Sequence, residues 1–258
     1  MQDWKSHIDR NHPCWVGYRE LLERLPGDAF PDPQTLSGLL PSGRAGAAAK
    51  GIRFCPAAEL PEVAYEKHIF ETGEVSTREN SWHDLFNALV WCRFPQLKTA
   101  MNEVHYRHLD EEQGGRRGSR RDALTLLDES GVVVFSRDEA LLSALSARNW
   151  DVAFIQRRGA WNETDIRVCG HAILEKFLAP YKSLTAHALL VPVQDTVSAA
   201  DPDAILAEGI RTGSLLKSPG DLSPLPLMGI PGWWKDGEQD EAFYADRHVF
   251  RLPRKNRP

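Results

Sequence analysis

The sequence predicts an α+β protein in which helices and short, mostly antiparallel strands surround one hydrophobic core. Apolar residues make up 42% of the 258 residues, which is enough for a sizeable core. Segments with helical spacing of apolar side chains are interspersed with short β-type runs, and a Pro-rich stretch follows them. We therefore expect one globular domain over residues 1–258.

The N-terminal part of this domain, residues 1–50, is expected to combine helix and loop. The Asn-His-Pro sequence at 11–13 is typical of a helix start, since the missing N–H of proline is harmless there. Residues 26–50 are rich in Pro, Gly and Ala and indicate loop with a short helix. Strands are predicted over 51–55 and over 65–75, the second with a turn at Thr72-Gly73.

Two consecutive helices are the clearest elements of the sequence. The first runs from Ser81 to Phe94, and Pro95 opens a second that extends to about Leu109. A loop rich in Gly and Arg follows at 114–121. Beyond it the pattern predicts a β-hairpin from 124–127 and 132–135. Two further helices are predicted over 138–148 and 170–178, and three further strands near 152–156 and 164–169 and over 184–191. An extended Pro-rich wrap is expected over 209–258.

Polar side chains lie beside the apolar stripe of both clear helices. His83 and Asn87 are four positions apart on the first helix, and Lys98, Asn102 and His105 follow one line along the second. A buried polar group without a partner costs about 1–3 kcal/mol, so such residues indicate a hydrogen-bond network or a site. If the two flanks converge, they form a small polar pocket. We predict His83 or His105 as general base or metal ligand, and Asn87, Asn102 and Lys98 as residues that hold substrate.

The Gly/Arg loop adds candidates for anion binding. Arg120 and Arg121 carry guanidinium groups that can clamp phosphate or carboxylate in a bidentate manner. Asp122 is predicted as a second metal ligand or an orienting carboxylate. The alternatives are a solvated surface loop and a structural Arg121–Asp122 salt bridge.

Two later histidines complete the predicted site. Both His171 and His187 are predicted to bind substrate. His171 begins a helix, where the helix dipole lowers the pKa of an imidazole and leaves it neutral, so that it can serve as a hydrogen-bond acceptor or a ligand. His187 shares the apolar face of its strand with Leu189 and Val191, which predicts burial. For each of these histidines a structural role in the core is the alternative.

Composition limits the compartment and the partners. The net charge is −5, which disfavours nucleic acid as the main partner of the surface. The four cysteines include no closely spaced pair, and the N-terminus has no apolar leader. The longest apolar run, 186–193, is too short for a membrane span. We expect a cytoplasmic protein with reduced thiols and no membrane partner.

Several of these residues also carry a resemblance to a known family. The sequence resembles a bacterial family of uncharacterised proteins, domain of unknown function 3025, over roughly residues 60 to 250. The resemblance rests on Phe70-Glu71-Thr72-Gly73, Ser81 to Trp91, Phe94-Pro95, Lys98, Asn102, His105, Arg121 to Thr125, Asp128-Glu129, Gly170-His171-Ala172, Pro180-Tyr181-Lys182 and Pro231-Gly232-Trp233. It implies membership and no particular activity.

Three interpretations of the polar residues follow. The first is a metal- or His-dependent hydrolase that acts on a small molecule bearing phosphate or carboxylate; the cofactor is open, and a divalent metal is the candidate for the metal-dependent case. The second is a non-catalytic binding module for a nucleotide, RNA or protein partner, with the Arg loop and exposed tryptophans such as Trp4 or Trp161 as its contacts. The third is a buried hydrogen-bond network that only stabilises the fold.

Overall fold

A computed structural model of the protein describes residues 4–27, 29–41, 51–57, 65–109, 118–194 and 201–253. Short 3-10 helices occur at Trp4–His7, Pro13–Trp15, Arg158–Glu163, Pro219–Asp221 and Leu227–Gly229. The α-helices and strands are, in chain order, α1 (Arg19–Arg24), α2 (Pro33–Ser37), β1 (Arg53–Pro56), α3 (Tyr65–Thr72), β2 (Glu74–Thr77), α4 (Trp82–Arg93), α5 (Pro95–Arg107), α6 (Ser119–Ser130), β3 (Gly131–Ser136), α7 (Glu139–Ser146), β4 (Asp165–Val168), α8 (His171–Lys176), β5 (Thr185–Pro192), α9 (Pro202–Thr212), β6 (Leu222–Pro226) and α10 (Glu241–Tyr244).

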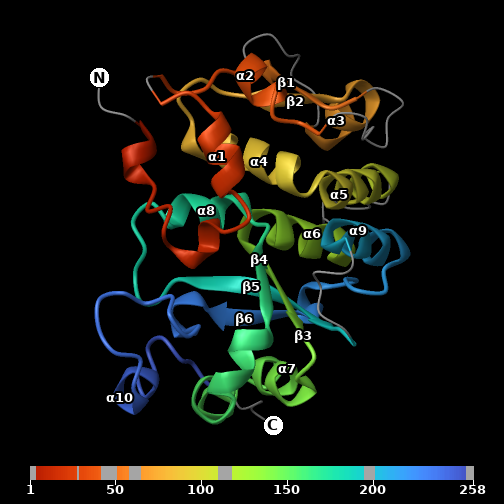
Figure 1. Ribbon diagram of the computed structural model, residues 1–258. Coiled ribbons are helices and arrows are strands. Elements are labelled where there is room, and N and C mark those ends of the chain that lie inside the picture. The colour runs from red at the N-terminus through yellow and green to blue at the C-terminus, as the bar shows by residue number, and fades with distance from the viewer. Residues whose placement is uncertain are drawn as a thin grey trace.

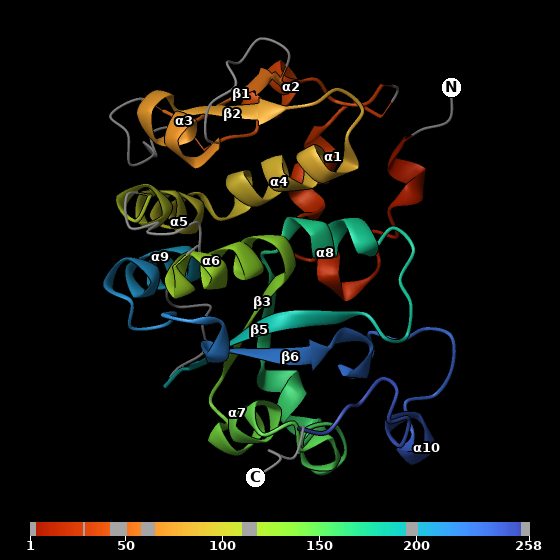
Figure 2. The ribbon, with the colours of Figure 1, turned by 180° about the vertical axis from the view of Figure 1, so that it is seen from behind.

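A four-stranded sheet with the order β4-β3-β5-β6 lies between two groups of helices. All six residues of β3 are buried, because α6 and α8 lie on one side of the sheet and α7 on the other (Figures 1 and 2). A strand that is covered on both faces needs a continuous apolar run, and Val132 to Phe135 supplies one.

Two further layers lie above α6 and α8. Helices α4 and α5 pack on α8, α6 and α9, and the two-stranded parallel sheet β1–β2 lies with α2 and α3 over α4 and α5 (Figure 1). Polar residues on α3, β2, α4 and α5 therefore face polar residues on α6 and α8. This space between the layers holds the candidate site.

The predicted α+β class is confirmed, but the strand pairing differs from the expectation. Among the strand pairs of the described residues, β1–β2 and β3–β5 are parallel, whereas β3–β4 and β5–β6 are antiparallel. The parallel pair β3–β5 arises because α7, β4 and α8 connect these two strands.

The predicted hairpin over 124–127 and 132–135 is wrong. The first half of it belongs to helix α6, and only the second half is a strand. Ala123, Leu124 and Leu127 follow helical spacing and are buried against the sheet. Gly131 does not form a hairpin turn but ends α6 and begins β3.

Two other predicted strands are also helical. Of residues 65–75, Tyr65–Thr72 form α3 and only the last two belong to β2. Residues 152–156 lie in a π-helical turn, Asp151–Gln156, and Trp150, just before this turn, stacks on Phe154 with the ring centroids 5.8 Å apart. Aromatic residues four positions apart fit a helical turn as well as a strand, so a short apolar run does not decide between them.

The Pro-rich C-terminal segment contributes to the main sheet rather than only wrapping over it. Strand β6 pairs with β5 at the edge of the sheet. Pro224 and Pro226, which lack a backbone N–H, are tolerated there because none of the described strands pairs with the outer side of β6. Trp233 is buried in the core, as expected for a large aromatic ring. Within the described ranges, no helix combines the length and the apolar character that a membrane span requires.

Candidate metal centre in a polar pocket

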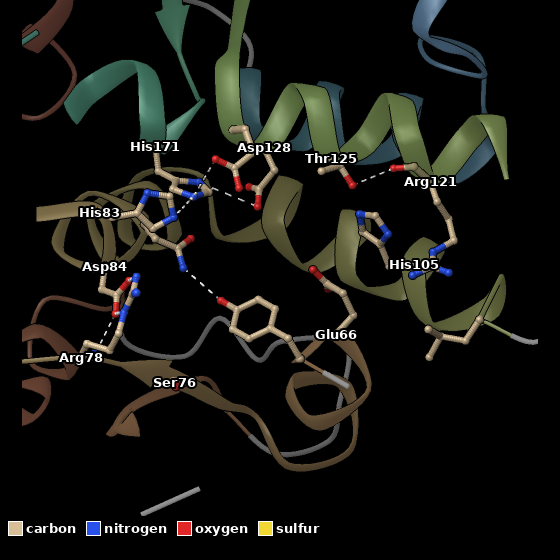
Figure 3. A pocket seen from close by; sticks show the side chains of 14 residues that line it. Glu66, Ser76, Arg78, His83, Asp84, His105, Arg121, Thr125, Asp128 and His171 are labelled. Carbon is tan, nitrogen blue, oxygen red and sulfur yellow. Dashed lines mark hydrogen bonds and ion pairs between the residues drawn. The ribbon is translucent and has the colours of Figure 1, made fainter. Parts of the chain in front are cut away.

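A polar cavity of about 560 Å³ lies between the layers, with walls from α3, β2, α4, α5, α6 and α8 (Figure 3). This volume is within the usual range for sites that bind small molecules. The lining residues are Tyr65, Glu66, Ser76, Arg78, His83, Asp84, Asn87, His105, Leu109, Arg121, Thr125, Asp128, Glu129 and His171.

Two histidines meet at one end of this cavity. His83 lies in the first turn of α4 and His171 at the start of α8. Their Nε2 atoms are 2.9 Å apart, and the two ring planes are inclined by 81° (Figure 3). His171 is buried, and this burial lowers its pKa to about 4, so its imidazole is neutral near pH 7.

Glycine at two chain junctions brings α8 close to the end of α6. The N–H of Gly170 donates to the carbonyl oxygen of Gly131 at 2.8 Å. A Cβ atom on Gly170 would lie 2.3 Å from the nitrogen of Gly131 and 2.7 Å from the carbonyl oxygen of Glu129. Only glycine permits this approach. As a result, His171 Nε2 lies 3.6 Å from the carboxylate of Glu129.

His83, Glu129 and His171 form a group that can hold a metal ion. Each offers one ligand atom, and these atoms lie within 4.8 Å of one another. Two histidines and one glutamate with an open fourth position are a ligand set of catalytic zinc sites. Two nitrogens bound to a tetrahedral zinc ion lie about 3.3 Å apart, as follows from Zn–N bonds of about 2.0–2.1 Å. A shift of a few tenths of an ångström therefore converts the His83–His171 contact into a chelate.

The other ring nitrogen of each histidine faces a carboxylate. His83 Nδ1 lies 3.4 Å from Glu175 Oε2, and His171 Nδ1 lies 3.9 Å from Asp128 Oδ2. In metal sites such carboxylates hold the proton on the outer nitrogen and leave the inner nitrogen free to bind the metal. If both Nδ1 atoms carry the proton here, two Nε2 lone pairs face each other across 2.9 Å. A positive centre between them, a metal ion or an added proton, relieves this repulsion.

A chain of buried polar contacts holds Asp128 in place behind His171. The ammonium group of Lys98 donates to Asp128 and, at 3.0 Å, to the Asn87 side-chain oxygen. The Asn87 amide donates in turn to the Tyr65 hydroxyl at 3.0 Å. Burial by itself raises the pKa of Asp128, but Lys98 and His171 outweigh this effect, so that the pKa is lowered and the carboxylate is charged.

The opposite end of the cavity has a different chemical character. The buried Arg121 of α6 and His105 of α5 lie there, with Glu66 of α3 on the facing wall (Figure 3). The Asn102 amide donates to Glu66 Oε2 at 2.6 Å and to the Glu66 main-chain oxygen at 2.8 Å, which fixes α3 on α5. Burial raises the pKa of Glu66, against the opposing effects of Asn102, Lys98 and Arg121.

Arg78 and Asp84 form a separate ion pair at the edge of the cavity. The guanidinium group of Arg78 donates to both carboxylate oxygens of Asp84, at 2.9 and 2.8 Å. Ser81 accepts a hydrogen bond from the Asp84 N–H at 3.2 Å and caps α4. The pair and the cap together fix the first turn of α4, from which His83 projects.

The structure brings together most of the site residues that the sequence predicts. The predicted residues that line the cavity are His83, Asn87, His105, Arg121 and His171. Lys98 and Asn102 lie directly behind its wall and bond to residues that line it. The predicted convergence of the α4 and α5 flanks therefore occurs.

Three predicted site residues do not line this cavity. Arg120 donates to the carbonyl oxygens of Ile210 and Arg211 near the end of α9. Asp122 lies in the first turn of α6, partly buried and away from the cavity. His187 lies in β5, opposite Pro224 of β6, where burial lowers its pKa. The arginines of the loop at 114–117 are outside the described residues, so their predicted role as a contact for a nucleotide, RNA or protein stays a prediction. The prediction that Trp4 and Trp161 are exposed is wrong, since both are buried in the core.

The sequence interpretation missed several carboxylates of the site. Glu129 and Asp128 fell in a predicted hairpin turn, and Glu66 fell in a predicted strand. A helical interpretation of residues 119–130 finds the first two, since Arg121, Thr125 and Asp128 then share one face. Glu175 carries no local signal, because only the packing of α8 against α4 brings it to His83.

Fold and site together define an α+β protein with a histidine–carboxylate cluster at one end of a polar pocket. Residues 52–254 match the family model described as "Protein of unknown function (DUF3025)". The chain therefore belongs to this family. Neither the comparison with curated proteins nor that with solved structures gave a match.

Proposed function

We propose that this protein is a metal-dependent hydrolase whose metal ion binds to His83, His171 and Glu129. The observation that carries the proposal is the arrangement of the two imidazoles. Their Nε2 atoms face each other at 2.9 Å while both Nδ1 atoms face carboxylates, and Glu129 lies beside them. This geometry fits a divalent transition metal, and two histidines with one carboxylate favour zinc.

The substrate is proposed to be a small molecule that bears a phosphate or carboxylate group. A metal ion at this cluster lowers the pKa of a bound water molecule and so supplies a nucleophile at neutral pH. In hydrolysis the water oxygen bonds to the electrophilic carbon or phosphorus. The bond to the leaving group breaks with its electron pair, and a water proton ends on the leaving group.

The remaining lining residues support this chemistry in three ways. Glu175, whose carboxylate lies 3.4 Å from His83 Nδ1, orients that imidazole, and the charge of Asp128, 3.9 Å from His171 Nδ1, favours a proton on that nitrogen without a hydrogen bond to it. The Tyr65 hydroxyl accepts a hydrogen bond from Asn87 and can donate its own proton to a developing negative charge. The guanidinium group of Arg121 attracts the anionic part of the substrate.

The first experiment measures metal binding. Metal-free protein is titrated with Zn²⁺ by calorimetry, and the unchanged protein is expected to bind one ion per chain. His83→Ala and His171→Ala should each lose this binding, whereas His187→Ala is the matched control and should keep it. Equal zinc binding by His171→Ala and the unchanged protein would overturn the proposal.

The second experiment looks for turnover. Metal-free and zinc-loaded protein are compared on a panel of carboxylic esters, amides and phosphate esters. Hydrolysis that requires zinc and disappears in His171→Ala supports the proposal. Stoichiometric zinc binding without hydrolysis of any member would favour a metal-binding protein without this activity.

A further inference from the structure

One wall of the cavity is a single helix face that connects its two ends. Arg121, Thr125, Asp128 and Glu129 all lie on α6 and all line the cavity. Spacings of four and three residues place Arg121, Thr125 and Asp128 on one side of the helix, and Glu129 follows Thr125 by four positions. The helix thus presents the guanidinium group of Arg121 at one end of the cavity (Figure 3). At the other end it presents the proposed metal ligand Glu129, 3.6 Å from His171.

The helix geometry gives the distance between these two ends. A rise of about 1.5 Å per residue separates Arg121 and Glu129, eight positions apart, by about 12 Å along the axis. Both side chains extend into the cavity, so about 10 Å is the expected order of the distance between the guanidinium group and the metal centre.

The charges along this wall differ from end to end. Asp128 is paired with Lys98, and Thr125 between the ends is uncharged, with its hydroxyl bonded to the Arg121 carbonyl oxygen at 3.0 Å. At the far end the cationic Arg121 and the imidazole of His105 lie near Glu66. Because burial raises the pKa of Glu66, this carboxyl group takes up a proton more readily than an exposed glutamate does.

We infer that the substrate is an elongated small molecule whose terminal oxyanion, a carboxylate or a phosphate, binds at Arg121 and His105 while a bond about 10 Å away is hydrolysed at the metal centre. This inference rests on the proposed function and narrows it. The oxyanion is a recognition group and not the group that reacts. A small phosphate monoester cannot reach both ends, so phosphatase activity on such esters is not expected.

A series of two-ended probes tests the inference on the zinc-loaded protein. Hydroxamic acids bind zinc, and monohydroxamates of straight-chain dicarboxylic acids carry a carboxylate at the other end. Their dissociation constants are measured as the chain is lengthened. A second series ends in a phosphonate and separates a phosphate site from a carboxylate site. A third series ends in a methyl ester and lacks the charge.

We expect the affinity of one charged series to pass through a maximum where its ends are about 10 Å apart. At this maximum the charged probe should bind about tenfold or more tightly than its methyl ester, as a charge-assisted hydrogen bond provides. Arg121→Gln should abolish the maximum. The matched control is Arg120→Gln, since Arg120 bonds to α9 and does not line the cavity, and it should keep the maximum.

The remaining outcomes distinguish a failure of this inference from a failure of the proposed function. Zinc-dependent hydroxamate binding that does not depend on chain length or terminal charge overturns the inference and leaves the proposed function intact. Absence of zinc binding overturns both. The length series uses the unchanged protein, so it decides the question even if Arg121→Gln fails to fold.

Discussion

His83 and His171 are 88 positions apart in the chain, yet their Nε2 atoms lie 2.9 Å from each other at the end of a polar cavity. Each imidazole projects from the first turn of its helix, and each has a carboxylate near its outer nitrogen. The contact therefore depends on how α4 and α8 pack. It also depends on Glu175 and Gly170, which are not themselves proposed to bind the metal ion.

Glu175 is predicted to raise the metal affinity by orienting His83. Glu175→Gln removes the negative charge 3.4 Å from His83 Nδ1, so the imidazole becomes a weaker and less well oriented ligand. Zinc affinity should fall by about tenfold to a hundredfold, as is typical for such outer carboxylates. Because Glu175 is only partly buried, the free energy of unfolding should change by no more than about 0.5 kcal/mol.

Calorimetric zinc titration and urea unfolding of the metal-free protein check both parts of this prediction. The matched control is Glu208→Gln, a glutamate on the exposed side of α9. It should leave the zinc affinity unchanged. If Glu175→Gln also binds zinc like the unchanged protein, the proposed orienting role is wrong.

Gly170 is predicted to be required for both stability and metal binding. Gly170→Ala places a Cβ atom 2.3 Å from the Gly131 nitrogen, so the junctions of α6 with β3 and of β4 with α8 must separate. Such overpacking costs about 1–3 kcal/mol of unfolding free energy. Zinc affinity should fall as well, since the separation moves His171 away from Glu129.

Gly159 provides the comparison for this variant. A Cβ atom on Gly159 has no other atom within 4 Å, so Gly159→Ala should change the free energy of unfolding by less than about 0.5 kcal/mol. Urea unfolding measures stability and calorimetry measures zinc binding. Equal stability of the two alanine variants would contradict the prediction.

The sequence predicts the fold class and the polar flanks of α4 and α5, because strong helical periodicity marks both helices. The flank residues His83, Asn87 and His105 line the cavity as expected. Burial next to an apolar stripe is a local property, so the sequence carries it. The same pattern cannot distinguish a functional site from a hydrogen-bond network that only stabilises the fold. Lys98 belongs to both, because its ammonium group donates to Asn87, which lines the cavity, and to Asp128 behind His171.

The remaining site residues depend on information that the local pattern lacks. The sequence from Asp128 to Gly131 fits a turn as well as the end of a helix. The helix forms because it buries the apolar side of α6 on the sheet, and this is a tertiary contact that the local pattern does not contain. Asp122, predicted as a second metal ligand or an orienting carboxylate, lies in the first turn of α6 and does not line the cavity. Pairing of His83 with Glu175 is a tertiary contact with no sequence signature.

Glu66 is predicted to make stability depend on pH. Burial raises its pKa in the folded protein above the value of 4.5 that an exposed glutamate has. The folded state thus favours the protonated carboxyl group. This contribution is fully present below pH 4.5 and is lost as the pH rises through the folded pKa, because the folded state must then hold a buried charge.

Glu66→Gln tests this directly, since the amide oxygen can still accept the hydrogen bond from Asn102 but the side chain does not titrate. The free energy of unfolding of the unchanged protein, relative to that of Glu66→Gln, should fall as the pH rises from about 4.5. Glu139→Gln, an exposed glutamate at the start of α7, is the control and should show a constant difference. Urea unfolding at a series of pH values measures these differences. A relative stability that rises with pH would contradict the prediction. It would mean that Arg121 and Lys98 lower the pKa of Glu66 more than burial raises it. Glu66 would then be a charged carboxylate at the far end of the cavity and would repel the anion proposed to bind there.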